Sequence, residues 1–184
     1  MNSYPIHTTD SAPEGAKQAL AGLEKAFGLV PNLAATMANS PPLVNGFVAV
    51  FGQFAGGTFT GGERQTLLLS NAVANNCAWA VAFHSTLALN EGVDAADVDA
   101  LRCGELPADA RLAALSTLTR ALIDKRGHLD EGDAKAFRVA GFGTNQLLEA
   151  ITGVAISTMA NYAGNITQPP LEEPFRAQAW GDGY

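Results

Sequence analysis

The sequence predicts an all-α fold in a single domain. Apolar residues recur at helical spacing along an Ala- and Leu-rich chain, and no long stretch alternates with period two. Pro, Gly, Asn and Asp interrupt this pattern at intervals of one helix length. The chain has 184 residues, enough for one domain with a sizeable core. No fixed-period repeat or linker divides it.

The caps and breakers place the helices one by one. Thr60 with Glu63 forms a capping-box pattern, and Gly28 follows the expected end of the first helix. The helical segments are expected at residues 11–27, 34–38, 41–55, 60–74, 77–90, 95–101, 109–125, 130–140 and 144–165. We expect one domain over residues 1–184, with an N-terminal segment 1–39, a core 40–170 and an irregular tail 171–184 ending at Tyr184.

Composition limits the class of partner. Apolar residues make up 47% of the chain and charged residues 16%, which is too apolar for a disordered chain and low in charge for a lone monomer. Part of the surface is therefore expected to be buried in a homo-oligomer. The net charge of −7, with Lys and Arg scattered, argues against a nucleic-acid partner.

Cysteine usage and the start of the chain suggest a cytoplasmic protein. The first residues carry no signal-peptide pattern, so reduced thiols are expected and a Cys77–Cys103 disulfide is the minority interpretation. The run 67–89 is apolar but contains Asn, Ser and His residues that are costly in hydrocarbon, so no membrane span is expected.

Candidate chemistry centres on the stretch from Asn75 to His84. It reads as a Cys-x-x-Cys-x-x-x-His redox motif in which Ala80 stands at the second cysteine position. Cys77 and His84 occupy the positions that such a motif requires. Because a lone thiol cannot form a disulfide within the motif, the two-cysteine cycle is not possible here.

The adjacent Asn75 and Asn76 predict a break between two helices, because Asn is a poor helix former and a good cap. Cys77 would then lie near a helix N-terminus, where the helix dipole lowers a thiol pKa. Helical spacing predicts that Cys77, Ala80 and His84 share one face, with Cys77 and His84 roughly 10 Å apart along the axis.

Other chemistries have weaker support, and each motif residue also has a purely structural interpretation. Cys77 can be a buried, inert small hydrophobe, and His84 a histidine satisfied by a neighbour. The sequence shows no nucleotide-binding loop and no serine-hydrolase elbow. The potential zinc ligands lack finger-like spacing, so no metal and no cofactor are expected. These potential ligands are His7, Cys77, His84, Cys103 and His128.

The residues around the motif resemble a known family. Gly62-Glu63-Arg64-Gln65-Thr66-Leu67-Leu68-Leu69, with the Asn75–Ala80 stretch and His84-Ser85, is similar to the core of the carboxymuconolactone decarboxylase family, which includes alkylhydroperoxidase D. The segments Phe27-Gly28-Leu29-Val30-Pro31-Asn32 and Asn161-Tyr162-x-x-Asn165 extend the resemblance. It covers roughly residues 13 to 175.

The resemblance implies an all-α fold of about six helices that assembles as a dimer, trimer or hexamer. It also implies roles for individual residues. Cys77 matches the resolving cysteine, Ala80 the peroxide-attacking one and His84 the histidine of a proton relay. Gln65 stands where the family's relay glutamate lies, and Glu63 lies two residues earlier.

Three interpretations follow from the missing thiol. The favoured expectation is a family-level, peroxiredoxin-type antioxidant oxidoreductase, in which Cys77 would act alone as a peroxidase thiol recycled by an external thiol reductant. Alternatively, a pocket around Glu63, Gln65, Trp79, Ala80 and His84 would bind a small organic acid or lactone, with His84 as acid or base. The third interpretation is a catalytically silent oligomeric scaffold.

Overall fold

The computed structural model describes residues 4–181, and in this part of the chain it is helical with no strand. The all-α prediction is confirmed. The elements are α1 (Glu14–Phe27), α2 (Asn32–Met37), α3 (Pro41–Ala55), α4 (Gly61–Ala74), α5 (Ala78–Asn90), α6 (Ala95–Arg102), α7 (Ala110–Asp124), α8 (Glu131–Val139), α9 (Thr144–Thr167) and the 3₁₀ helix η1 (Glu173–Gln178). Residues 4–181 form nine α-helices, more than the six or so implied by the resemblance. Three of the nine, α2, α6 and α8, are short.

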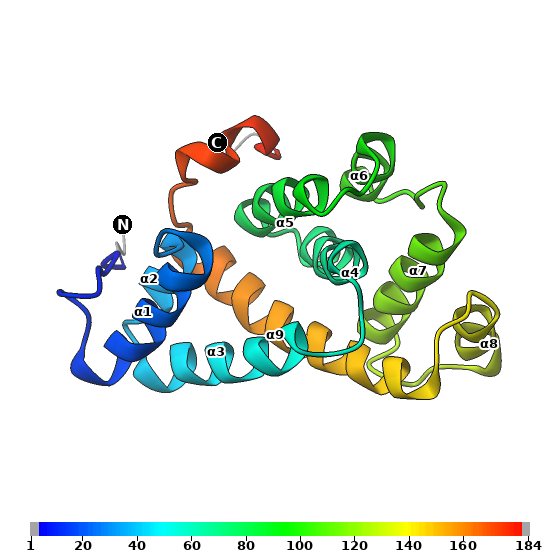
Figure 1. The fold of residues 1–184 in the computed structure, drawn as a ribbon, viewed down its shortest axis with the longest axis horizontal. Helices are drawn as coiled ribbons and strands as arrows, with labels where there is room; N and C mark the ends of the chain where they lie inside the picture. Colours follow the sequence, from blue (N-terminus) through cyan, green and yellow to red (C-terminus); the bar gives the residue numbers. More distant parts are fainter. Residues whose placement is uncertain (1–3, 182–184) are drawn as a thin grey trace.

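The longest helix, α9, organises the others. Its 24 residues extend for roughly 36 Å at ~1.5 Å per residue. It runs along most of the molecule in Figure 1 and contacts α2, α3, α4, α5, α7 and α8. The α4–α5 pair packs across the middle of the molecule, and α1 packs against α3. None of the helices within residues 4–181 is both long and apolar enough to cross a membrane.

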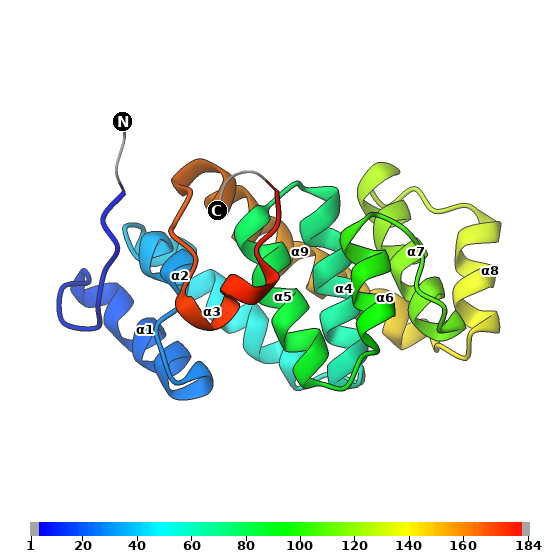
Figure 2. The ribbon, with the colours of Figure 1, turned by 90° about the horizontal axis from the view of Figure 1, so that it is seen from above.

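The core consists of two apolar clusters that meet at α4. One cluster joins α1, α2 and α5 to the C-terminal half of α9, and the other joins α7, α8 and the end of α3 to its N-terminal half. Leu69 of α4 belongs to the first cluster, whereas Leu67 and Leu68 belong to the second. Figure 2 shows this division, with α1 and α2 toward one end and α7 and α8 toward the other.

Local signals set most of the helix ends. The Thr60–Glu63 capping box forms as expected, and Gly28 closes α1 in the left-handed conformation with φ of 75°. The first helix differs at its start, because α1 begins after Pro13 and not at Ser11. The hydroxyl of Ser11 instead accepts a hydrogen bond from the Thr8 amide in the preceding turn.

The C-terminal tail is not irregular, contrary to the sequence-based expectation. Residues Glu173–Gln178 form η1, and this segment lies against α5. Arg102 donates hydrogen bonds to the carbonyl oxygens of Gln178 and Ala179, which holds the tail to α6. These long-range contacts order a segment whose local sequence carries only a Pro-Pro helix stop. The expected end of the tail, residues 182–184 with Tyr184, lies outside the described residues.

Candidate functional site

The helix break before the motif forms where the Asn pair predicts it. Asn75 caps the end of α4, and Asn76 has a φ of 50°, in the left-handed region that Asn tolerates better than most residues. Cys77 is the N-cap of α5, and its backbone is extended, with φ of −101° and ψ of 93°. Cys77 therefore lies at the helix N-terminus, as expected.

The extended backbone of Cys77 turns its side chain away from the face that Ala80 and His84 share. The expectation that all three residues line one face is wrong, because an N-cap residue lacks helical backbone angles. The sulfur packs against α9, where a Cβ atom added at Gly164 would lie 2.8 Å from Sγ. The residue is 1% exposed, beneath an open groove that includes Asn165 and Gln168.

The expected low thiol pKa is also contradicted. Burial raises the pKa of Cys77 above its ordinary value, and this effect outweighs the backbone N–H groups of Ala80 and Trp79, which lower the pKa. The position at a helix N-terminus does favour a thiolate, but removal from water costs more. Cys103 is also a free thiol and is exposed at the end of α6, so the two cysteines are in different environments.

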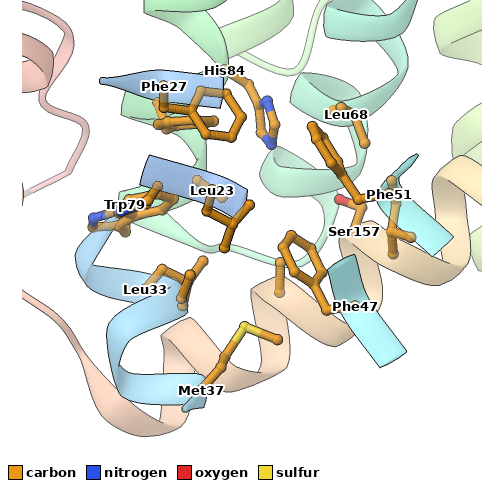
Figure 3. Close-up of a pocket in the computed structure, with 16 residues that line it drawn as sticks. Leu23, Phe27, Leu33, Met37, Phe47, Phe51, Leu68, Trp79, His84 and Ser157 are labelled. Carbon is orange, nitrogen blue, oxygen red and sulfur yellow. The ribbon is translucent and has the colours of Figure 1, made fainter. Parts of the chain in front are cut away.

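Ala80 and His84 open into an apolar cavity on the other side of α5. The cavity lies among α1, α2, α3, α4, α5 and α9, and its volume is about 560 Å³, which includes the solvent-filled space at its mouth. Figure 3 shows the rings of Phe27, Phe47 and Phe51 around this space together with His84. Trp79 and Ala80, which the sequence suggests as pocket residues, both line it.

His84 is held in one orientation by Gln65. Its Nδ1 lies 2.9 Å from Oε1 of Gln65, and burial lowers the pKa of the imidazole to about 3. The ring is therefore neutral at pH 7. With the Gln65 oxygen as acceptor, Nδ1 carries the proton and Nε2 keeps its lone pair. No residue within 4–181 donates a hydrogen bond to Nε2, so this nitrogen is a free acceptor that faces the cavity.

Glu63 does not belong to this cavity, which corrects its assignment to the site. One carboxylate oxygen accepts from the Thr60 amide in the capping box, and the other lies 2.5 Å from Nε of Arg111. The residue is 5% exposed. Its role is to fix the start of α4 to α7, because a buried carboxylate with both oxygens engaged is costly to separate from its partners.

Trp79 connects the cavity wall to the C-terminal tail. Its indole Nε1 donates to Oε2 of Glu172 at 2.9 Å, and the ring stacks on Phe83 at a centroid distance of 4.9 Å. The other Glu172 oxygen accepts a hydrogen bond from the backbone N–H of Asn32 at the start of α2. The sequence analysis did not identify Glu172, because nothing local connects a tail glutamate to a tryptophan 93 residues away.

Ser157 is a second polar residue of the cavity that the sequence analysis missed. It lies on α9 and is 2% exposed, and its hydroxyl oxygen accepts from Nδ2 of Asn161 at 3.2 Å. Asn161 also donates to Oδ1 of Asn71, which receives a second hydrogen bond from Asn75. These amides link the Asn75 turn to the cavity. The recurring Asn residues of α4 and α9 were the available signal.

The described part of the chain offers no evident metal site. Within residues 4–181, no three His, Cys, Asp or Glu side chains lie together as a metal would require.

Comparison with known proteins places the fold but not the activity. No protein-family profile and no curated protein matches the sequence. An uncharacterized peroxidase-related protein from Ralstonia eutropha JMP134, described as an alkylhydroperoxidase AhpD core, has a similar structure. The TM-score is 0.82 at 20% identity, over 94% of this chain and 93% of that one. A peroxidase-related protein from Silicibacter sp. TM1040 gives 0.77 at 17% identity, over 95% and 93%.

A third similar structure is that of the debrominase Bmp8. A cysteine-to-alanine variant of that protein, in complex with 2,3,4-tribromopyrrole, gives a TM-score of 0.77 at 17% identity, over 97% of this chain and 95% of that one. Identities this low show a shared fold alone. The chain therefore has the alkylhydroperoxidase D-like fold that the motif residues implied.

Proposed function

We propose that this chain is a non-redox protein of the alkylhydroperoxidase D-like fold, which binds a small, uncharged cyclic molecule and acts on it through His84. A lactone is the class that fits best. One observation carries the proposal: Ala80 and His84 line the cavity, whereas the Cys77 sulfur lies outside it against α9. The chemistry available to a bound molecule is therefore that of a neutral imidazole.

The peroxidase interpretation has less support. A two-cysteine cycle needs a thiol at Ala80, and a one-cysteine cycle needs an accessible thiolate. Cys77 is 1% exposed, and burial raises its pKa, so both the access and the thiolate fraction are low. An antioxidant role with an external thiol reductant would require this residue to open to solvent.

The cavity wall favours a neutral ligand over an organic acid. Its lining contains no Lys or Arg, and His84 remains neutral because burial lowers its pKa to about 3. A carboxylate would lose its hydration here without gaining a counter-charge. Burying an unpaired neutral polar group already costs on the order of 2–7 kcal/mol, and burying an unpaired charge costs more. The complex of the Bmp8 variant supports the idea that this fold can hold a small flat ring.

Lactone hydrolysis suits the geometry. As water adds to the carbonyl carbon, its proton would pass to Nε2 of His84, and the ring C–O bond would then break as the leaving oxygen takes that proton. Gln65 holds the imidazole in the required tautomer through Nδ1. The product is a hydroxy acid, which ionises and leaves an apolar cavity that cannot stabilise its charge.

Hydrolysis of dihydrocoumarin, a neutral aromatic lactone, tests the proposal. We expect His84→Leu to lower kcat/KM by about 100-fold, in the range for loss of a general base. The exposed His128 supplies a matched control, and His128→Leu should hydrolyse the lactone at the unaltered rate. Equal rates in the His84→Leu and unaltered proteins would reject the proposal.

Hydroperoxide consumption tests the competing interpretation in the same preparations. We expect no thiol-dependent consumption by the unaltered protein, and none after Cys77→Ala. Consumption that disappears in Cys77→Ala would establish one-cysteine peroxidase chemistry instead. Consumption that arises only after Ala80→Cys would support the view that this chain lacks redox function because one thiol is missing.

Self-association remains part of the proposal. Large apolar side chains are exposed along α9, which is unusual for a monomer when they gather on one helix. They are Leu148, Ile151, Tyr162 and Ile166. We expect Ile166→Glu to lower the molar mass found by light scattering after gel filtration. Val139→Glu, which alters an exposed apolar residue on α8, is the matched control.

A further inference from the structure

The cavity contains two polar side chains that are free to bind a ligand. They are His84 on α5 and Ser157 on α9, and Figure 3 labels both. The only other polar group among the lining side chains is the indole N–H of Trp79, which already donates to Glu172. The other lining side chains are apolar. A ligand that needs polar contacts must therefore obtain them from these two residues.

The hydroxyl of Ser157 is oriented as a donor. Its oxygen accepts from Asn161, and within residues 4–181 no carbonyl oxygen accepts its proton. Buried serine hydroxyls in the middle of a helix usually donate to the carbonyl four residues earlier. Ser85 of this chain does so, with its hydroxyl 2.7 Å from the Val81 oxygen. The Ser157 proton is thus available to an acceptor in the cavity.

The amides behind Ser157 hold this arrangement in place. Asn161 and Asn71 are wholly buried, and Nδ2 of Asn161 lies 3.0 Å from Oδ1 of Asn71 and 3.2 Å from the Ser157 oxygen. An Nδ2 group can only donate, so the serine oxygen must accept from it. The hydrogen bond from Asn161 therefore leaves the Ser157 proton free to point elsewhere.

We infer that Ser157 is the carbonyl-binding residue of this cavity, and that its ligands are uncharged planar rings bearing a carbonyl oxygen. The inference rests on the proposed function, narrows its ligands to planar rings with a carbonyl oxygen, and adds a second residue. The Ser157 hydroxyl donates to the carbonyl oxygen while Nε2 of His84 faces the attacking water. The same hydrogen bond strengthens as negative charge develops on that oxygen.

Three bicyclic probes separate the features of this ligand class. Coumarin carries a ring carbonyl, naphthalene has similar rings without one, and coumarin-3-carboxylate adds a charge. Binding of each probe is measured by titration calorimetry, with naphthalene near its solubility limit. For the unaltered protein we expect coumarin to bind about 5-fold more tightly than naphthalene, the factor for one net hydrogen bond. Coumarin-3-carboxylate should bind at least about 10-fold more weakly than coumarin.

A Ser157→Ala variant tests the residue itself. The substitution removes one hydroxyl, and Asn161 keeps its hydrogen bond to Asn71. We expect coumarin affinity to fall about 5-fold and naphthalene affinity to change less than about 2-fold. The kcat for dihydrocoumarin should fall more than the coumarin affinity, because the bond is stronger in the transition state. Thr158→Ala, which alters the next residue outside the cavity, should change none of these values.

The outcomes distinguish this inference from the proposed function. Equal losses of coumarin and naphthalene binding in Ser157→Ala would indicate a packing role and overturn the carbonyl assignment. No loss for either probe, with His84-dependent hydrolysis retained, would overturn the assignment and leave the proposed function standing. Binding of coumarin-3-carboxylate as tight as that of coumarin would overturn the uncharged class. Absence of both probe binding and hydrolysis would reject the inference together with the proposed function.

Discussion

The two sides of α5 differ in what their residues can do. Cys77 and His84 belong to one sequence motif, yet the thiol packs against Gly164 on α9 while the imidazole faces the apolar cavity. Burial disfavours the charged form of both groups, but with different consequences. It raises the pKa of Cys77 and so lowers the thiolate fraction, whereas it lowers the pKa of His84 and leaves the imidazole neutral. A motif thus defines positions, and the environment decides which of them can do chemistry.

The largest expected effect concerns the pH dependence of stability on the cavity side. Above about pH 6.5, His84 is neutral in both the folded and unfolded chains. Between pH 6.5 and about 3, the unfolded chain binds a proton that the folded chain does not, so stability falls as the pH is lowered. The whole interval corresponds to roughly 3–5 kcal/mol at about 1.36 kcal/mol per pKa unit.

Urea unfolding at pH 7 and near pH 4 measures this effect, with variants compared at each pH. His84→Leu cannot titrate, so its stability should fall by roughly 2–4 kcal/mol less than that of the unaltered protein between those values. His128→Leu removes an exposed histidine and should behave like the unaltered protein. Parallel losses in all three proteins would show that His84 titrates normally.

The next largest effect concerns the packing on the thiol side. Gly164→Ala places a Cβ atom 2.8 Å from the Cys77 sulfur, so we expect a loss of about 1–3 kcal/mol of unfolding free energy. Combining it with Cys77→Ala, which removes the sulfur, should recover most of that loss in a double-mutant cycle. If the double variant loses as much unfolding free energy as Gly164→Ala alone, the added methyl group clashes with an atom other than the Cys77 sulfur.

A smaller effect is expected at the link between the cavity wall and the tail. Glu172→Gln removes the charge that accepts from both the Trp79 indole and the Asn32 amide. We expect a loss of roughly 1–2 kcal/mol in thermal or urea unfolding, with dihydrocoumarin hydrolysis weakened through the Trp79 wall. Glu173→Gln alters an exposed neighbour whose partner is Arg176, and it should have little effect. Equal stability of the two variants would contradict this role for Glu172.

The smallest effect should follow from removing the thiol. Because Cys77 does not line the cavity, Cys77→Ala should change coumarin affinity by less than about 2-fold. Thiol titration with an aromatic disulfide should label exposed Cys103 first and Cys77 much more slowly, since each unit of raised pKa lowers the thiolate fraction about tenfold. Rapid labelling of Cys77 in a Cys103→Ser variant would revive the peroxidase interpretation.

Local signals in the sequence predicted the elements better than the contacts between them. The Asn75–Asn76 break and the Thr60 cap depend on neighbouring residues, so they could be read directly. Glu63 was assigned to the site because it lies two residues before the position of the family's relay glutamate. Its second partner, Arg111, lies 48 residues away in sequence, so the ion pair could not be predicted from local residues. Cys77 was expected on the cavity face because helical spacing was applied to it. The helix begins one residue later, at Ala78, so the Cys77 side chain lies outside the shared face.

The indole of Trp79, which stacks on Phe83 at the edge of the cavity, is a fluorophore built into the protein. The chain has two tryptophans, and the other, Trp180, donates to the carbonyl oxygen of Arg102 away from the cavity. Replacing Trp180 by Phe would leave emission from a single indole that borders the cavity and bonds a carboxylate. The intensity and wavelength of that emission would then report directly whether the cavity is filled.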